Sequence, residues 1–226
     1  MKKLLFFSVL LVIVNTHAQT TINKVLNDFT TLKVYNGIDL ELVKSDKQSI
    51  EITGSKAEKV KIKEETDGTL KISLRFPETM AEGEVKATLF FNKDILVIDA
   101  NEGATITGKE IDQPKIDIKA QEGAFINLVI NTKHLYVKAS SGGVIKLSGT
   151  SKNQDINVDL GSTYHGYNME VSDVSMVKAG SGAKAEILAG ETVDAKVSFG
   201  GTIFYKGNPE VFKEKTVIGG TIEQRN

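Results

Sequence analysis

The sequence predicts an all-β fold: a right-handed parallel β-helix, or solenoid, with coils of about 19 residues and a less regular β segment before them. Three observations support this prediction. One phrase built around a glycine recurs through the C-terminal half of the chain, apolar and polar residues alternate with period two inside the copies, and no long stretch carries apolar residues at helical spacing. Val, Ile and Thr, which favour strands, are plentiful.

The recurring phrase occupies seven stretches of the chain from Leu96 onward. They are "VIDANEGATITG", "IDIKAQEGAFIN", "YVKASSGGVIKL", "NVDLGSTYHGYN", "MVKAGSGAKAEI", "AKVSFGGTIFYK" and "EKTVIGGTIEQR". One column aligns Gly103, Gly123, Gly142, Thr163, Gly182, Gly200 and Gly219, with successive copies 18 to 21 residues apart. A period near twenty residues is typical of a solenoid, in which each repeat buries its apolar face against its neighbours.

Columns beside the glycine predict which side chains face inward. Small or aliphatic residues dominate the positions three before and three after the glycine, so both columns are expected inside, with the glycine at the turn. The residue before the small column is charged in every copy: Asp99, Lys119, Lys138, Asp159, Lys178, Lys196 and Lys215. A column charged throughout must face water. We expect Asp99 to lie beside Lys119, and Asp159 between Lys138 and Lys178, as exposed ladder pairs that each contribute no more than about 1 kcal/mol.

Residues 29–95 are less regular than the coils of residues 96–226. Asn36-Gly37 and Asp67-Gly68 are turn signals between short strand patterns. Apolar residues recur here close to the later period: Leu32, Ile50, Leu70 and Leu89. Either coils begin in this segment, or antiparallel hairpins cap the first open edge of the solenoid, and the sequence leaves both possibilities open.

The N-terminus predicts export. Two lysines, an apolar run over Leu4–Val14 and the small residue Ala18 form the pattern of a secretory signal peptide at residues 1–18. The run is too short for a permanent membrane helix and no other segment approaches that length, so we expect no transmembrane segment in the mature chain. We therefore expect a protein of the periplasm, the cell surface or the extracellular space, with a flexible N-terminus at residues 19–28 and a single domain at residues 29–226.

Composition narrows the partners and the chemistry. Without the predicted signal peptide, 26 basic residues stand against 29 acidic ones, and the formal charge of −3 argues against nucleic acid as a partner. The two histidines of the predicted mature chain, His134 and His165, do not form a metal-ligand spacing, and the chain has no cysteine and no nucleophile or phosphate-binding motif. We predict no catalytic residues, no metal site and no cofactor.

Three stretches of the irregular segment carry a resemblance to a known family. They are "VYNGIDLELVKSD", "IEITGS" and "ETDGTLKISL", and glycine-rich coils follow them. In this order they resemble the bacterial family named putative auto-transporter adhesin, head GIN domain, over nearly the whole mature chain from Phe29 to Ile222. The resemblance implies a secreted or envelope-associated β-solenoid of Gram-negative bacteria with no established activity.

A polysaccharide-active enzyme on a β-helix is the main alternative function. It would require four carboxylates on neighbouring coils to gather: Asp117, Asp155, Asp159 and Asp194. The aligned residues of the coils between the first and the last of them are not acidic: Tyr136, Asn157 and Met176. Calcium needs six to eight oxygens close together, so the sequence favours a protein without enzymatic activity.

The fourth copy, "LGSTYHGYNMEV", departs from the pattern and holds the candidate ligand site. It places Gly166 in the inner apolar column and brings four residues that could bind a ligand: Tyr164, His165, Tyr167 and Asn168. Aromatic faces beside polar edges suit sugar rings, whereas the structural alternative is a bulge that repacks the tyrosines. We predict a binding or adhesion-like module for glycans or components of the cell envelope.

A group of apolar residues between Phe199 and Ile218 surrounds the closing coils. It is expected either to cover the C-terminal end of the solenoid or to form a surface for a homo-oligomer through that end. A self-associating structural protein of the envelope is therefore a third possible function.

Overall fold

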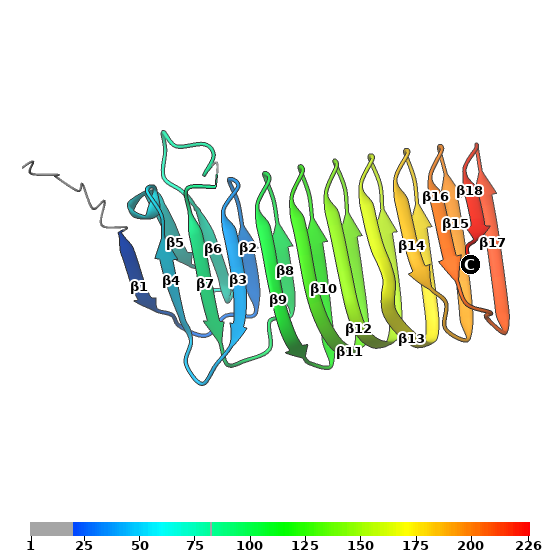
Figure 1. The fold of residues 1–226 in the computed structure, drawn as a ribbon, viewed down its shortest axis with the longest axis horizontal. Helices are drawn as coiled ribbons and strands as arrows, with labels where there is room; N and C mark the ends of the chain where they lie inside the picture. The colour runs from blue at the N-terminus through cyan, green and yellow to red at the C-terminus, as the bar shows by residue number, and fades with distance from the viewer. Residues whose placement is uncertain (1–19, 82) are drawn as a thin grey trace, which may run out of the picture.

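The computed structural model describes residues 20–81 and 83–226, which form a β-solenoid of about seven turns with a spacing of about 19 residues (Figure 1). The predicted fold class is confirmed. The predicted signal peptide, residues 1–18, lies outside the described residues. Glycine at the tight corners and β-branched residues between them match the requirements of short strands joined by tight turns.

In the described part of the chain, eighteen strands form one continuous sheet, and one short 3-10 turn, η1 (Ala57–Lys59), interrupts them. The strands are β1 (Thr21–Val25), β2 (Thr31–Val34), β3 (Asp39–Lys44), β4 (Ser49–Thr53), β5 (Val60–Glu64), β6 (Thr69–Leu74), β7 (Lys86–Phe91), β8 (Val97–Ala100), β9 (Thr105–Asp112), β10 (Lys115–Ala120), β11 (Phe125–Ala139), β12 (Val144–Val158), β13 (Thr163–Ala179), β14 (Lys184–Leu188), β15 (Thr192–Ser198), β16 (Thr202–Lys206), β17 (Val211–Val217) and β18 (Thr221–Gln224).

Parallel pairing arranges the coils into two ladders, the two layers of a flattened solenoid in Figure 1. The first ladder contains β6, β2, β8, β10, the C-terminal halves of β11, β12 and β13, then β15 and β17. The second ladder contains β7, β3, β9, the N-terminal halves of β11, β12 and β13, then β14, β16 and β18. Alternate side chains of both ladders point into one shared core, because side chains of a strand alternate between its two faces.

The tight corners between the ladders use two successive residues with positive φ, the geometry of a type I′ turn. In the fourth copy these residues are Leu160 and Gly161, with φ of 51° and 68°. The alignment of Thr163 with the glycine column is therefore wrong. Thr163 pairs with Val144 and Lys184, two residues beyond the corner.

The same shift corrects the charged column. Asn157, not Asp159, lies between Lys138 and Lys178 in the ladder. The two extra residues of the fourth copy lie inside β13, where its register against β12 shifts twice. The predicted pair of Asp99 with Lys119 does lie in register.

The irregular N-terminal segment contains both coils and a cap. The coil β2–β3 lies between the coil β6–β7 and the coil β8–β9, with parallel pairing on both sides. Beyond β6–β7, strand β5 pairs antiparallel with β6, β4 pairs antiparallel with β7, and β1 pairs antiparallel with β4. Each of the two possibilities left open by the sequence is thus correct for part of the segment.

The predicted flexible N-terminus at residues 19–28 is wrong for most of its length, because β1 belongs to the cap. Leu26 and Phe29 are buried behind it. The Lys24 Nζ lies 2.5 Å from a Glu64 carboxylate oxygen, and the Asn27 backbone N–H donates to the other oxygen at 2.7 Å. Burial of Leu26 and Phe29 and the ion pair of Lys24 with Glu64 offset the conformational entropy that the segment loses when it is ordered.

Candidate functional site

In the fourth copy, which we call the irregular coil, a large side chain at one inward position is compensated by a glycine at the next. Tyr164 stands in the column of Ile145 and Ala185, and Gly166 precedes Ile187 in the next inward column. A Cβ on Gly166 would lie 2.5 Å from the Tyr164 ring, so the ring fills the space that a side chain at residue 166 would take. The phenol donates a hydrogen bond to the Gln154 Oε1 at 3.3 Å.

Tyr164 is completely buried, and this burial raises the pKa of its phenol. The prediction of Tyr164 as a ligand-binding residue is therefore wrong, because no surface ligand can reach it. The physical reason is its position in the column of inward side chains, beside Ile145 and Ala185. The sequence alignment of the fourth copy was displaced by two residues and put Gly166 in that column instead.

The other three predicted residues come together on the outer face of the second ladder. His165, Tyr167 and Asn168 line a shallow groove of about 450 Å³, which we call the bulge groove. Its remaining walls are Phe125, Val144, Lys146, Leu147 and Glu186. A register shift between β12 and β13 at this point gives Tyr167 and Asn168 their places beside the groove.

The bulge groove is polarised by one half-buried carboxylate. Glu186 accepts a hydrogen bond from the Lys184 Nζ at 2.9 Å, and its other oxygen lies 2.6 Å from the His165 Nδ1. Burial alone would raise the pKa of Glu186, but the hydrogen bonds from Lys184 and His165 outweigh it and hold that pKa below its usual value. The carboxylate thus stays charged and fixes the His165 ring at the edge of the groove.

Tyr167 supplies the aromatic surface of the bulge groove. It is half-buried, and burial, followed by the charge of Glu186, raises the pKa of its phenol. The Lys206 Nζ lies 5.2 Å from the centre of its ring. A neutral ring beside fixed donors and acceptors can stack on a sugar and hydrogen-bond its hydroxyl groups.

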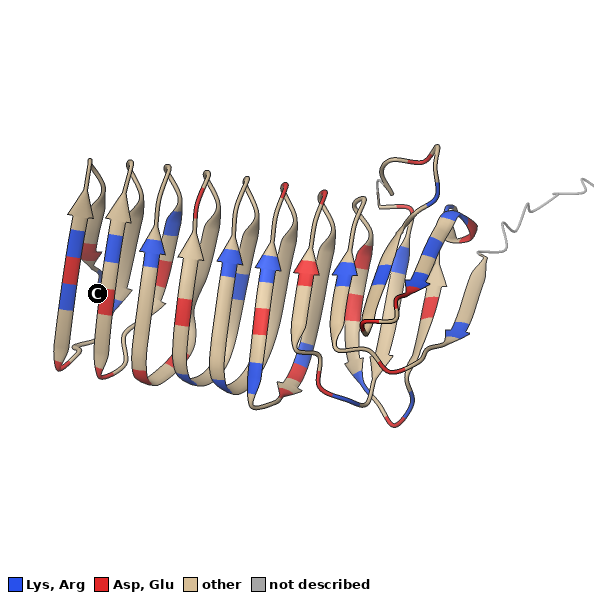
Figure 2. Cartoon of the chain, turned by 180° about the vertical axis from the view of Figure 1, so that it is seen from behind, with Lys and Arg blue, Asp and Glu red and all other residues tan. Residues whose placement is uncertain are grey.

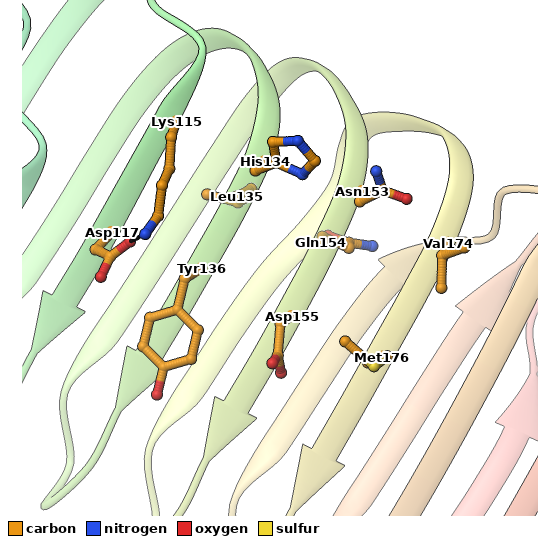
Figure 3. Close-up of a pocket in the computed structure, with 10 residues that line it drawn as sticks. All are labelled: Lys115, Asp117, His134, Leu135, Tyr136, Asn153, Gln154, Asp155, Val174 and Met176. Carbon is orange, nitrogen blue, oxygen red and sulfur yellow. Dashed lines mark ion pairs between the residues drawn. The ribbon is translucent and has the colours of Figure 1, made fainter.

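A second groove, of about 520 Å³, lies on the outer face of the first ladder (Figure 3). Tyr136 stands between Asp117 and Asp155 of the neighbouring coils, and Met176 follows in the same column. Burial, and then the charges of Asp155 and Asp117, raise the pKa of the Tyr136 phenol. Sequence reasoning gave Tyr136 no role, although a correct alignment of the fourth copy places this tyrosine between two acidic residues of one column.

The carboxylates of the enzyme alternative are separated by other side chains. Asp117, Asp155 and Asp194 share one outward column, but Tyr136 and Met176 stand between them. In the described part of the chain, no group of three or more His, Asp or Glu side chains is placed to hold a metal ion. Within residues 20–81 and 83–226, no helix has the length and apolar character needed to cross a bilayer.

Comparison with known proteins identifies one family model that matches the chain. It is described as "Putative auto-transporter adhesin, head GIN domain" and matches residues 28–209. No curated protein matches the chain.

Solved structures share the fold at low sequence identity. A putative adhesin of Bacteroides fragilis has a TM-score of 0.83 at 17% identity, covering 93% of this chain and 98% of that one. A putative lipid binding protein of Parabacteroides distasonis has a TM-score of 0.73 at 17% identity, with coverage of 93% and 98%. A putative adhesin of Parabacteroides merdae has a TM-score of 0.68 at 18% identity, with coverage of 93% and 97%.

Proposed function

The chain belongs to the family of the putative auto-transporter adhesin, head GIN domain, and from this premise we propose that it is an exported, non-enzymatic adhesion module that binds glycans through the bulge groove. The family and two of the solved structures with this fold are named as adhesins, which supports the adhesion-like role. The N-terminal pattern of a signal peptide supports export.

One observation carries the choice of ligand. The groove combines the half-buried ring of Tyr167 with the Asn168 amide and with the fixed pair of His165 and Glu186. Sugars present both apolar ring faces and hydroxyl groups, so an aromatic surface bordered by oriented donors and acceptors matches them. The long, regular outer face around the groove suits an extended chain of sugars more than a small enclosed molecule.

The test is a binding screen of residues 19–226 on an array of glycans and envelope polysaccharides. We expect specific binding that falls roughly five- to thirtyfold in Tyr167→Ala/Asn168→Ala, since losing a stacked aromatic and an amide contact costs about 1 to 2 kcal/mol. Tyr136→Ala is the matched control, because it removes a half-buried tyrosine from the other ladder.

Circular dichroism establishes that each variant keeps the wild-type fold. Binding that survives in Tyr167→Ala/Asn168→Ala but is lost in Tyr136→Ala would move the glycan site to the Tyr136 groove. A protein that binds no glycan on the array would contradict the proposed ligand class.

A further inference from the structure

A row of lysines crosses the whole outer face of the first ladder. Neighbouring strands place ten outward residues in register, one from each coil or cap strand. In order along the solenoid axis they are Lys63, Lys71, Lys33, Asp99, Lys119, Lys138, Asn157, Lys178, Lys196 and Lys215, and we call them the lysine row. Figure 2 shows this face, with blue segments near the arrowheads of successive strands.

The lysine row is unfavourable for the folded protein alone. Neighbouring strands are about 4.8 Å apart, and like charges that face each other across a ladder destabilise it. Lys63 and Lys71, Lys119 and Lys138, and Lys178 and Lys196 are such neighbours. Alternating signs would give the same fold without this repulsion, so the charge pattern requires another explanation.

Most of the row has no carboxylate partner. Lys63 pairs with Glu65 at 2.8 Å, and the Lys71 Nζ lies 4.2 Å from the centre of the Tyr35 ring. Among the described residues, no ion pair within 4.0 Å is formed by the other six: Lys33, Lys119, Lys138, Lys178, Lys196 and Lys215.

The one acidic member of the row is withdrawn from its surface. Asp99 is buried, with 8% of its surface exposed, and its Oδ1 accepts a hydrogen bond from the Asn101 Nδ2 at 3.0 Å. The Gln121 Nε2 lies 3.5 Å from the same oxygen. Because neutral amides hold this carboxylate, the lysines on either side keep their charges available to an external anion.

The row is narrow. Asp117, Asp155 and Asp194 lie two residues before Lys119, Asn157 and Lys196 on the same strands and face the same side. A wide polyanion such as a nucleic acid duplex would press its phosphates onto these carboxylates. The row also contains no arginine, the residue best suited to bidentate contacts with phosphate.

We propose that the lysine row binds a linear anionic polysaccharide, with the chain along the solenoid axis and its carboxylates over successive coils. Eight of the ten positions of the row carry a lysine, which provides a series of weak contacts whose sum depends on the length of the polymer. This site is independent of the bulge groove, which lies on the other ladder.

The experiment measures binding of residues 19–226 to polygalacturonate, with dextran as the neutral polymer. We expect polygalacturonate alone to bind, with an affinity that falls as salt increases because the contacts are exposed charges. Lys138→Gln/Lys178→Gln/Lys196→Gln should weaken binding at least tenfold and reduce its salt dependence. The matched control, Lys86→Gln/Lys109→Gln/Lys133→Gln, removes the same charge from exposed positions outside the row and should change binding less than twofold.

Thermal unfolding gives a second readout. The row variant should be at least as stable as the wild type, since it loses repulsion and no ion pair.

Equal weakening of polygalacturonate binding by the two triple variants would overturn the proposal, as would wild-type protein that binds no polygalacturonate at 0.15 M salt, roughly the physiological ionic strength. Duplex DNA that binds as tightly as polygalacturonate would overturn the choice of polymer. Tyr167→Ala should leave this binding unchanged, so failure of the glycan groove and failure of the lysine row are distinguishable.

Discussion

In the irregular coil, the Tyr164 ring fills the space that a side chain at Gly166 would occupy. In the neighbouring coil Ile145 and Leu147 fill the same two columns. The sequence contained the information needed to see this, because Leu160-Gly161 offers a corner glycine two residues before Thr163. Column alignment by period alone could not locate the two extra residues, since a bulge can lie anywhere along a strand.

We predict that Gly166→Ala destabilises the fold by about 1 to 3 kcal/mol, because its methyl group would overlap the Tyr164 ring. In the Tyr164→Ile background the same change should cost less than half as much, since the ring is gone. Urea unfolding of the four proteins of this cycle measures both values. Equal costs in the two backgrounds would show that the ring is not what constrains residue 166.

At the scale of elements, strand positions were easier to predict than their partners. The turn signal Asn36-Gly37 does separate β2 from β3, and Asp67-Gly68 separates β5 from β6. The regular spacing of Leu32 and Leu70 reflects a true ladder pair, whereas Ile50 meets Leu89 across an antiparallel pair. Period-two alternation is the same for a parallel coil and an antiparallel cap, so it could not distinguish them.

The cap predicts a specific dependence of stability on pH. The hydrogen bond from Lys24, followed by that from the Asn27 backbone, lowers the pKa of Glu64 in the folded state. A lowered carboxyl pKa stabilises the fold above the unfolded value and loses this contribution as pH falls through the folded value. The free energy of unfolding should therefore fall below about pH 4.5, the ordinary value for glutamate.

Glu64→Gln isolates this contribution from those of other carboxylates. The variant should be less stable than the wild type at pH 7 by no more than about 1 kcal/mol, and the difference should shrink in acid. Glu58→Gln, at an exposed position of η1, is the control. A wild-type advantage that stays constant from pH 7 to roughly pH 3 would contradict the role of the Glu64 charge.

At the scale of the whole molecule, the period of the repeat predicted the solenoid. Which side chains lie together on an outer face depends on the register of each strand pair. The acidic column around Tyr136 depends on the register of consecutive coils. The extension of the lysine row to Lys33 and Lys71 depends on pairings between segments far apart in the chain. Such pairings follow from the insertion of one coil between two others, which no local pattern in the sequence indicates.

The C-terminal end of the solenoid presents open strand edges. Strand β17 pairs only with β15, and β18 only with β16, among the described residues. Lys213, Glu214 and Lys215 at the centre of β17 are exposed, and charges on an edge strand oppose pairing with another chain. Association through this end therefore stays a prediction, and these charges are expected to keep it weak.

Removal of the edge charges tests this role. Lys213→Thr/Lys215→Thr should increase the concentration-dependent mass measured by sedimentation velocity, because threonine favours strands and only Glu214 remains charged on β17. Lys86→Thr/Lys109→Thr removes the same charge elsewhere and should not change the mass. A wild-type oligomer whose mass is the same in both variants would show that the charges of β17 do not limit association.

The insertion of β2–β3 between two later coils sets an order for folding. Its neighbour β6–β7 is complete only when the chain has been made as far as Phe91, and its neighbour β8–β9 only at Asp112. A chain that emerges N-terminus first must therefore hold its first coil without partners, and the N-terminal part assembles as one unit through contacts distant in sequence. Each later coil finds a finished template beside it, so growth beyond Asp112 is local, sequential and directed toward the C-terminus.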